Sequence, residues 1–150
     1  MSDRPLAFPF KRPFKGKRSA VREHEALESE LPIIEQQLMR LAQDWSMRTA
    51  IDGLTLVVMR QGAPTLRWRV SKNLLGKQRY IDLFGDAGAP IIEAASSDVL
   101  QLLIGFEGRR ALLNARSRAA HAAYRALTDY RSAIDRLPPC PEICTAPTFP

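Results

Sequence analysis

The chain has 150 residues and a formal net charge of +6; 45% of its residues are hydrophobic and 25% are charged. This composition is typical of one globular domain with tails and differs from that of a disordered protein. No apolar run reaches the roughly 18 residues that a membrane-spanning helix needs. No apolar segment typical of a signal peptide follows the basic N-terminus, so we expect a cytoplasmic protein.

Charge is segregated along the chain. Basic residues dominate 1–18, 51–83 and 106–137, whereas acidic residues dominate the intervening segments 19–50 and 84–105. Alternating blocks of this kind favour binding to a polyanion over a uniformly solvated surface.

Residues 1–18 have the composition of an extended basic arm. Prolines at four-residue spacing exclude a regular helix, and phenylalanines alternate with the lysines and arginines. The pattern fits either phosphate attraction with stacking on bases, or a solubilising tail whose phenylalanines pack on the domain. We expect one α+β domain over residues 19–137, followed by a proline-rich tail over 138–150 that contains Cys140 and Cys144.

The first regular element that the sequence predicts is helical. Ser19 is a candidate N-cap for a run of helix-forming residues, and Pro32 either kinks this helix or begins a second one. Beyond the proline one helical face is apolar, formed by Ile34, Leu38, Leu41 and Trp45. We expect this face to pack in the core while the glutamates of residues 23–35 face solvent; the alternative is an acidic contact for a basic partner.

From Gly53 the apolar period changes to two, which predicts three β-strands joined by short turns. The strands are centred on Leu56, Trp68 and Ile81, and the third is expected to extend to Leu83. The turns fall at residues 61–64 and 73–77. Sequential strands with short connections usually pair, so we expect an antiparallel meander.

The second predicted strand has Arg67 and Arg69 on one face, and Lys72, Lys77 and Arg79 flank the turn that follows. A ribbon with arginines on one face can enter a major groove, where arginine reads guanine through two hydrogen bonds. The alternative is the polar outer face that any one-sided sheet requires. We favour nucleic-acid binding, with Arg79 on the same face, because a solvent-facing surface usually mixes both signs of charge.

Two further helices are predicted after a glycine- and proline-containing segment. The first lies near residues 91–104, with Gly105 and Gly108 at its end. The second lies near 106–137 and has an apolar residue every seven positions from Phe106 to Ile134. A helix of that length exceeds what a small sheet covers, so the stripe predicts a helical hairpin with the helix predicted over residues 33–48, a dimer, or both. Its other faces carry further candidate phosphate contacts, namely Arg109, Arg110, Arg116 and Arg118.

The sequence contains no catalytic, cofactor or metal motif. His24 and His121 are isolated on predicted helices. Cys140 and Cys144 lack the second pair of ligands that a zinc site needs. We therefore expect a protein without enzymatic activity, cofactor or metal.

Two segments carry a resemblance to a known family: Leu66–Val70 (LRWRV) with Arg79–Gly85 (RYIDLFG), and Glu107–Asn114 (EGRRALLN) with the helix after it. With these motifs the chain resembles an uncharacterised family of small proteins encoded on integrating conjugative elements of proteobacteria. The resemblance implies an accessory role in maintenance, regulation or transfer of a mobile element, and it implies no particular binding residue. The predicted meander followed by a helix is also similar, as a fold, to the AP2-like arm-binding module of integrases.

The leading hypothesis is a non-enzymatic, DNA-associated accessory protein with little sequence preference. Its candidate contacts are Arg67, Arg69, Lys72, Lys77, Arg79, Arg109, Arg110, Arg116 and Arg118. The alternative hypothesis is an assembly factor that dimerises, or binds a protein partner, through the long C-terminal helix.

Overall fold

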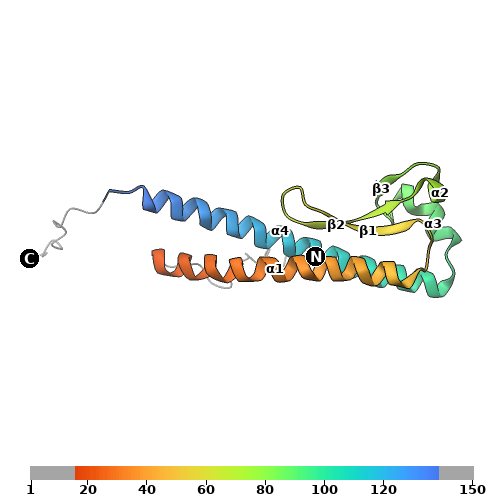
Figure 1. Cartoon of the computed structure of the whole chain (residues 1–150), viewed down its shortest axis with the longest axis horizontal. Coiled ribbons are helices and arrows are strands. Elements are labelled where there is room, and N and C mark those ends of the chain that lie inside the picture. Colours follow the sequence, from red (N-terminus) through yellow and green to blue (C-terminus); the bar gives the residue numbers. More distant parts are fainter. Residues whose placement is uncertain (1–15, 139–150) are drawn as a thin grey trace, which may run out of the picture.

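The protein consists of a long helical hairpin and a small antiparallel sheet. The computed structural model describes residues 16–138. In chain order the elements are α1 (Gly16–Arg48), β1 (Leu54–Met59), β2 (Thr65–Val70), α2 (Lys72–Leu75), β3 (Arg79–Ile81), the 3-10 turn η1 (Asp86–Gly88), α3 (Ala89–Ala94) and α4 (Ser97–Asp135). Figure 1 shows α1 and α4 side by side along the molecule, with the sheet against them near the C-terminal end of α1. The expected α+β class and the order of its elements are confirmed.

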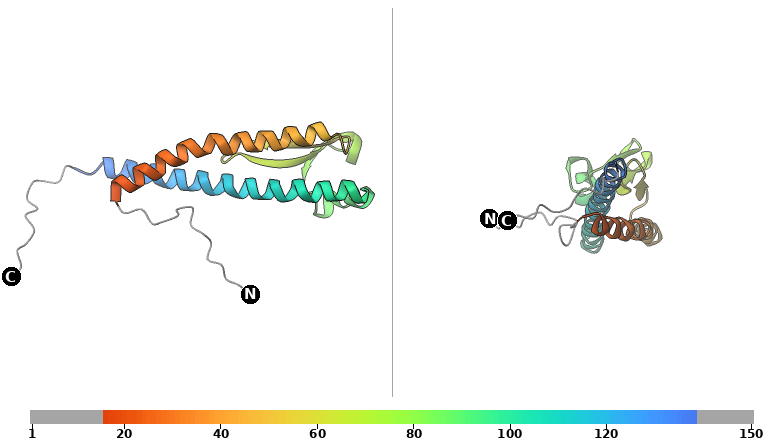
Figure 2. Two further views of the ribbon diagram at one scale, coloured as in Figure 1. Left: turned by 90° about the horizontal axis from the view of Figure 1, so that it is seen from below. Right: turned by 90° about the vertical axis from the view of Figure 1, so that its left-hand side faces the viewer.

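The two long helices pack through apolar side chains, most of which follow one another at spacings of three, four or seven residues. The buried apolar residues of α1 are Ala20, Leu27, Ile34, Leu38, Leu41 and Trp45, and those of α4 are Leu103, Phe106, Ala120, Ala123 and Leu127. Figure 2 shows the helices adjacent in two further directions. The helical hairpin predicted from the seven-residue repeat is therefore confirmed. None of the helices within residues 16–138 is both long and apolar enough to cross a membrane.

α1 differs from the prediction at its start and at its proline. It already includes Gly16, so Ser19 lies inside the helix and is not its N-cap. It also continues through Pro32, which is exposed, so the carbonyl that proline leaves without a donor lies on the solvent side. Lys17, expected in the basic arm, belongs to α1 and pairs with Asp135 at 3.2 Å. Residues 1–15 of that arm and residues 139–150, with both cysteines, lie outside the described residues.

The boundary between the last two helices was predicted wrongly. The expected helix near 91–104 is split, because the chain is extended at Ala95 and Ser96 and α4 begins at Ser97. The Ser96 side chain caps α4 by accepting a hydrogen bond from the Val99 N–H (3.4 Å). Gly105 and Gly108 therefore lie inside a helix of 39 residues. Each glycine costs about 1 kcal/mol in a helix interior, and the burial of the flanking side chains outweighs that cost.

The sheet has the order β1-β2-β3, and all neighbouring strands are antiparallel. Leu56 lies opposite Trp68, and Leu54 opposite Val70, on the face that packs on the hairpin. β3 is shorter than predicted and ends at Ile81, although Leu83 is still fully buried. The turn predicted at 73–77 is the one-turn helix α2, which ends at Gly76 in the left-handed conformation.

Three aromatic rings join the sheet to both long helices. Trp45 of α1 meets Trp68 of β2 edge-on, with ring centroids 5.0 Å apart, and meets Phe106 of α4 at 5.2 Å. The Trp45 indole N–H donates to the carbonyl of Leu54 (2.7 Å), which lies in β1. The sheet and both long helices therefore meet at one aromatic cluster.

The distal half of the hairpin is closed by a polar cluster around the buried His24. A guanidinium group only donates, so the 3.0 Å contact from Arg131 makes the His24 Nδ1 an acceptor. The opposite nitrogen, Nε2–H, then donates to the Thr128 hydroxyl (2.9 Å), which in turn donates to the Tyr124 carbonyl (2.9 Å). The Tyr124 ring stacks on the imidazole with centroids 4.5 Å apart. All polar groups of His24 are thus satisfied inside the helix pair.

The loop after α1 is tied to the end of β2 at Gly53. The Ser71 N–H donates to the Gly53 carbonyl (2.7 Å). Gly53 has a φ of +82°, and a methyl group on it would overlap the Ser71 hydroxyl. Two separate constraints, the backbone conformation and the close approach of Ser71, therefore require glycine here.

We expect Gly53→Ala to lower the free energy of unfolding by roughly 2–4 kcal/mol, because it combines left-handed strain with steric overlap. Gly62→Ala is the matched control. Gly62 has a φ of +78° and open space around it, so its loss should be about 1 kcal/mol. Adding Ser71→Ala should recover part of the Gly53→Ala loss, since the Ser71 hydroxyl is buried and has no hydrogen bond within residues 16–138. Urea unfolding of the parent protein and the three variants measures these differences; equal losses for the two glycines would contradict the steric explanation.

Candidate nucleic-acid interface

The edge of β2 is covered half by a strand and half by a helix. β3 pairs with Trp68–Val70, which leaves Leu66 without a strand partner on that side. The Asn114 side chain from α4 takes this place: the Leu66 N–H donates to Oδ1 (2.7 Å), and Nδ2–H donates to the Leu66 carbonyl (2.9 Å). Asn114 is 5% exposed and Leu66 is fully buried. These two bonds therefore satisfy main-chain groups that water does not reach.

Other polar side chains of α4 extend this contact along β2. Arg110, about one turn before Asn114, donates to the Leu66 carbonyl (3.2 Å), and Ser117, about one turn after it, donates to the Pro64 carbonyl (2.6 Å). The spacing of these α4 residues places them on one side of the helix. α4 is therefore held to α1 mainly by apolar packing and to β2 by polar contacts.

Glu107 joins α4 to the buried Trp68. Its carboxylate accepts one hydrogen bond from the Trp68 indole N–H (2.7 Å) and two from Arg110 (2.7 and 2.6 Å). Burial alone would raise the pKa of Glu107, but the bonds from Arg110 and Trp68 and the guanidinium charge outweigh burial, so this pKa lies below its ordinary value. The hydrogen bond to Glu107 likewise raises the pKa of Arg110. The charges of Glu107 and Arg110 are thus paired with each other and stabilise the folded structure.

Three of the arginines predicted to contact phosphates form internal ion pairs. Arg110 is bound to Glu107 as described above. Arg109 lies 3.7 Å from Asp44, and Arg116 lies 2.9 Å from Glu30, so both join α4 to α1. Exposed ion pairs are worth at most about 1 kcal/mol, so these two pairs neutralise charge more than they stabilise the hairpin. Arg109, Arg110 and Arg116 are weaker candidates for an external anion than the sequence indicates.

Arg67 and Arg69 lie on the face of the sheet that points away from the hairpin. Arg67 pairs with Val57, and Arg69 pairs with Thr55 on one side and Tyr80 on the other. Side chains of directly paired residues share a face, so the exposed Tyr80 ring lies beside Arg69. Residues 53–81 contain six lysines and arginines and no aspartate or glutamate. Within residues 16–138 neither Arg67 nor Arg69 has a hydrogen bond or an ion pair through its side chain.

The prediction that Arg79 shares this face is wrong. Arg79 pairs with Val70, whose side chain is fully buried on the hairpin side, so Arg79 points opposite to Arg69 from the margin of the sheet. The length and shape of the connection fix which residue of β3 faces which residue of β2, and a shift of one residue exchanges the two faces. Lys72 and Lys77 are exposed on the α2 connection near Arg79. They form a second basic group at the end of β2.

The fold places Arg118 close to Arg67, although the two residues are far apart in the sequence. Arg118 belongs to α4, but together with Arg67 it lines two hollows, of about 420 and 290 Å³, beside the part of β2 that β3 does not cover. Arg116 is only two residues away but points to the other side of α4, since successive residues turn by about 100°. The structure therefore separates Arg118 from Arg116, which the sequence had grouped together.

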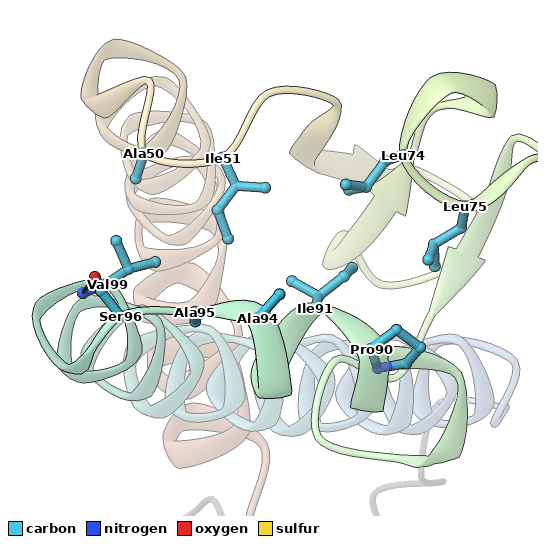
Figure 3. Close-up of a pocket in the computed structure, with 10 residues that line it drawn as sticks. All are labelled: Ala50, Ile51, Leu74, Leu75, Pro90, Ile91, Ala94, Ala95, Ser96 and Val99. Carbon is cyan, nitrogen blue, oxygen red and sulfur yellow. Dashed lines mark hydrogen bonds between the residues drawn. The ribbon is translucent and has the colours of Figure 1, made fainter.

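An apolar pocket of about 370 Å³ lies where α1 leads into β1 (Figure 3). Ile51, Leu74 and Ile91 point into it from the loop, α2 and α3. Of the described residues that line it, Ser96 has the one polar side chain, and its hydroxyl caps α4. Apart from this capping hydroxyl, the described lining of the pocket offers no acid, base or nucleophile. Nor do residues 16–138 contain a cluster of three or more His, Cys, Asp or Glu side chains that could hold a metal ion.

The sequence pattern did not single out Glu107, Asn114 and Ser117 as a contact surface. A signal was present, because these residues and Arg110 follow one another at spacings of three, four and three on a helix. The neighbouring seven-residue apolar stripe is stronger and predicts only the packing against α1. The polar stripe predicts a contact surface only if an unpaired strand edge is known to lie beside it, and the sequence does not show that edge.

The fold and its contacts define a class of protein: an α+β protein in which a small sheet with a basic outer face packs on a helical hairpin. No protein-family model matches the chain, and no curated protein or solved structure matches it.

Replacing Asn114 by alanine should lower the free energy of unfolding by roughly 2–4 kcal/mol, because a buried N–H and a buried carbonyl of Leu66 both lose a partner. Asn73→Ala is the control, since Asn73 is exposed; its effect should stay within about 0.5 kcal/mol. Thermal or urea unfolding measures both. A loss as small for Asn114→Ala as for the control would show that the edge of β2 does not need this side chain.

Glu107→Gln should reduce stability at neutral pH by about 1–3 kcal/mol, since it removes the charge that Arg110 and Trp68 bind. The folded-state pKa of Glu107 lies below the unfolded value of about 4.3. Its stabilisation is therefore complete above the unfolded pKa and is lost as pH falls through the folded pKa.

The difference between the parent protein and Glu107→Gln should thus be constant from neutral pH down to about pH 5 and shrink below that. Urea unfolding across this range measures it. Glu93→Gln, at an exposed residue of α3, should give a curve parallel to that of the parent. A difference for Glu107→Gln that does not change with pH would argue against the depressed pKa.

Proposed function

We propose that this chain is a cytoplasmic, non-enzymatic protein that binds nucleic acid, with DNA as the favoured ligand, through the outer face of its sheet. The observation that carries this proposal is the pair Arg67 and Arg69 on the outer face of β2. Arg67 is exposed and Arg69 is half-buried, and residues 53–81 contain no aspartate or glutamate. The family resemblance of its motifs supports an accessory role on a mobile element.

Strand geometry makes this pair a better candidate than a flexible basic tail. The side chains of Arg67 and Arg69 project from the same face of a central strand, about 7 Å apart along it, which is close to the spacing of successive phosphates. Tyr80 beside Arg69 adds an aromatic surface on which a base can stack. Contacts of this kind give affinity that falls steeply with salt and little preference for sequence, unless an arginine reaches a base edge.

The exposed apolar side of α4 favours a second candidate function, assembly with another copy of the chain. Ile104 is 54% exposed and Leu112 is 69% exposed on this side. Small residues continue the same helical face, namely Gly108, Ala111, Ala115, Ala119, Ala122 and Ala126, all of them exposed. An uninterrupted apolar strip of this kind is more often found at contacts between chains than on a monomer.

The full-length chain should bind a short fluorescent DNA duplex at low salt and lose affinity steeply between about 50 and 200 mM salt. The double variant Arg67→Gln/Arg69→Gln should bind at least about tenfold more weakly. Its slope of log K against log salt should be shallower by about 2, since two phosphate contacts are removed. Fluorescence anisotropy with the duplex and with the corresponding single strand measures both quantities.

Arg40→Gln is the matched control for charge, because Arg40 is exposed on α1 and has no hydrogen bond or ion pair within residues 16–138. Its binding curve should coincide with that of the parent protein. Absence of binding at low salt would refute the proposal. A stable dimer by light scattering, together with absence of binding, would instead support the assembly function.

A further inference from the structure

The two hollows lined by Arg67 and Arg118 adjoin each other beside the part of β2 that β3 does not cover. The larger is also lined by Glu107, Arg110 and Asp82, and the smaller by Gln61 and Met59. Three residues line both, namely Thr65, Arg67 and Arg118. These three therefore form the ridge between the hollows, with two of them on β2 and one on α4.

The two arginines of this ridge differ from three other arginines of α4, which are paired. Arg110, Arg109 and Arg116 are each paired with a carboxylate. Within residues 16–138 the guanidinium groups of Arg67 and Arg118 have neither a carboxylate nor a hydrogen-bond acceptor. The Thr65 hydroxyl likewise makes no hydrogen bond among these residues. Two like charges and a hydroxyl donor thus line the smaller hollow, whose described lining contains no carboxylate.

We propose that Thr65, Arg67 and Arg118 together hold one phosphate group of a nucleic-acid backbone. This inference rests on the proposed function and adds to it a residue from α4 that is not part of the sheet face. Guanidinium groups bind phosphate oxygens through two parallel hydrogen bonds, and a hydroxyl supplies one more donor. A phosphate is small enough to be bridged by both arginines, so it relieves their mutual repulsion as well as bonding to each.

The surrounding charges place the phosphate toward the smaller hollow. The described residues that line this hollow include no carboxylate. The larger hollow contains Asp82 and Glu107, and although Glu107 is neutralised by Arg110, Asp82 has no ion pair within residues 16–138. An anion is therefore repelled on the Asp82 side and attracted on the Gln61 side. A strand of nucleic acid crossing the sheet face at Arg69 would turn over the β2 edge at this point.

The test is a double-mutant cycle on duplex binding by the full chain at low salt. Arg67→Gln and Arg118→Gln should each weaken binding about tenfold. If both arginines hold the same phosphate, the double variant should bind far less than a hundredfold more weakly, because the second substitution removes a partner from a contact that is already broken. The salt slope of the double variant should then be shallower by about 1, not 2.

Arg125→Gln is the matched control, since Arg125 is exposed on the same side of α4 seven residues further along and lines neither hollow. It should change the affinity less than twofold, and circular dichroism should confirm that all variants are folded. If Arg118→Gln behaves like Arg125→Gln while Arg67→Gln/Arg69→Gln abolishes binding, the shared phosphate site is refuted and the proposed function stands. Additive effects of Arg67 and Arg118 would also refute it. If the parent protein does not bind, both proposals fail.

Discussion

The hydrogen bonds between the Asn114 side chain and the main chain of Leu66 hold the two layers of this protein in a defined position. β3 is too short to cover the β2 edge, and a buried unpaired N–H and carbonyl would each cost roughly 1–3 kcal/mol. An amide side chain has one acceptor and two donors, so it can replace one residue of a missing strand. Because this contact fixes where α4 lies along β2, it also fixes the position of Arg118 relative to Arg67.

The same region shows how the protein divides its many arginines between structure and binding. Arg110 is enclosed by Glu107 and the Leu66 carbonyl and therefore acts as part of the core boundary. Arg67 and Arg118, which are its neighbours around the β2 edge, form no ion pair in the described part of the chain. Net charge alone does not distinguish these two groups. The distinction comes from acidic residues that are close in space. It restricts the candidate anion-binding arginines to one edge and one face of the small sheet.

Much of the fold followed from local pattern, and the errors have identifiable causes. The period-two alternation around Leu56 and Trp68 predicted the paired strands, and the seven-residue repeat predicted the hairpin. The helix boundary near Gly105 was wrong because tertiary packing outweighed a helix penalty of about 1 kcal/mol per glycine. Pro32 was expected to interrupt a helix that in fact continues through it. In both cases a weak local preference was overcome by packing along a long helix.

The sequence by itself determined that this is an α+β protein with segregated basic charge, and that Arg67 and Arg69 share a face, since side chains alternate along any strand. Only the tertiary structure decided that Arg79 points to the opposite face and that Arg118 joins Arg67 at the edge of β2. Alternation and helical periodicity act between near neighbours, so a sequence displays them. The pairing register of β3 and the position of α4 on the sheet depend on contacts between distant residues, and no local period encodes them.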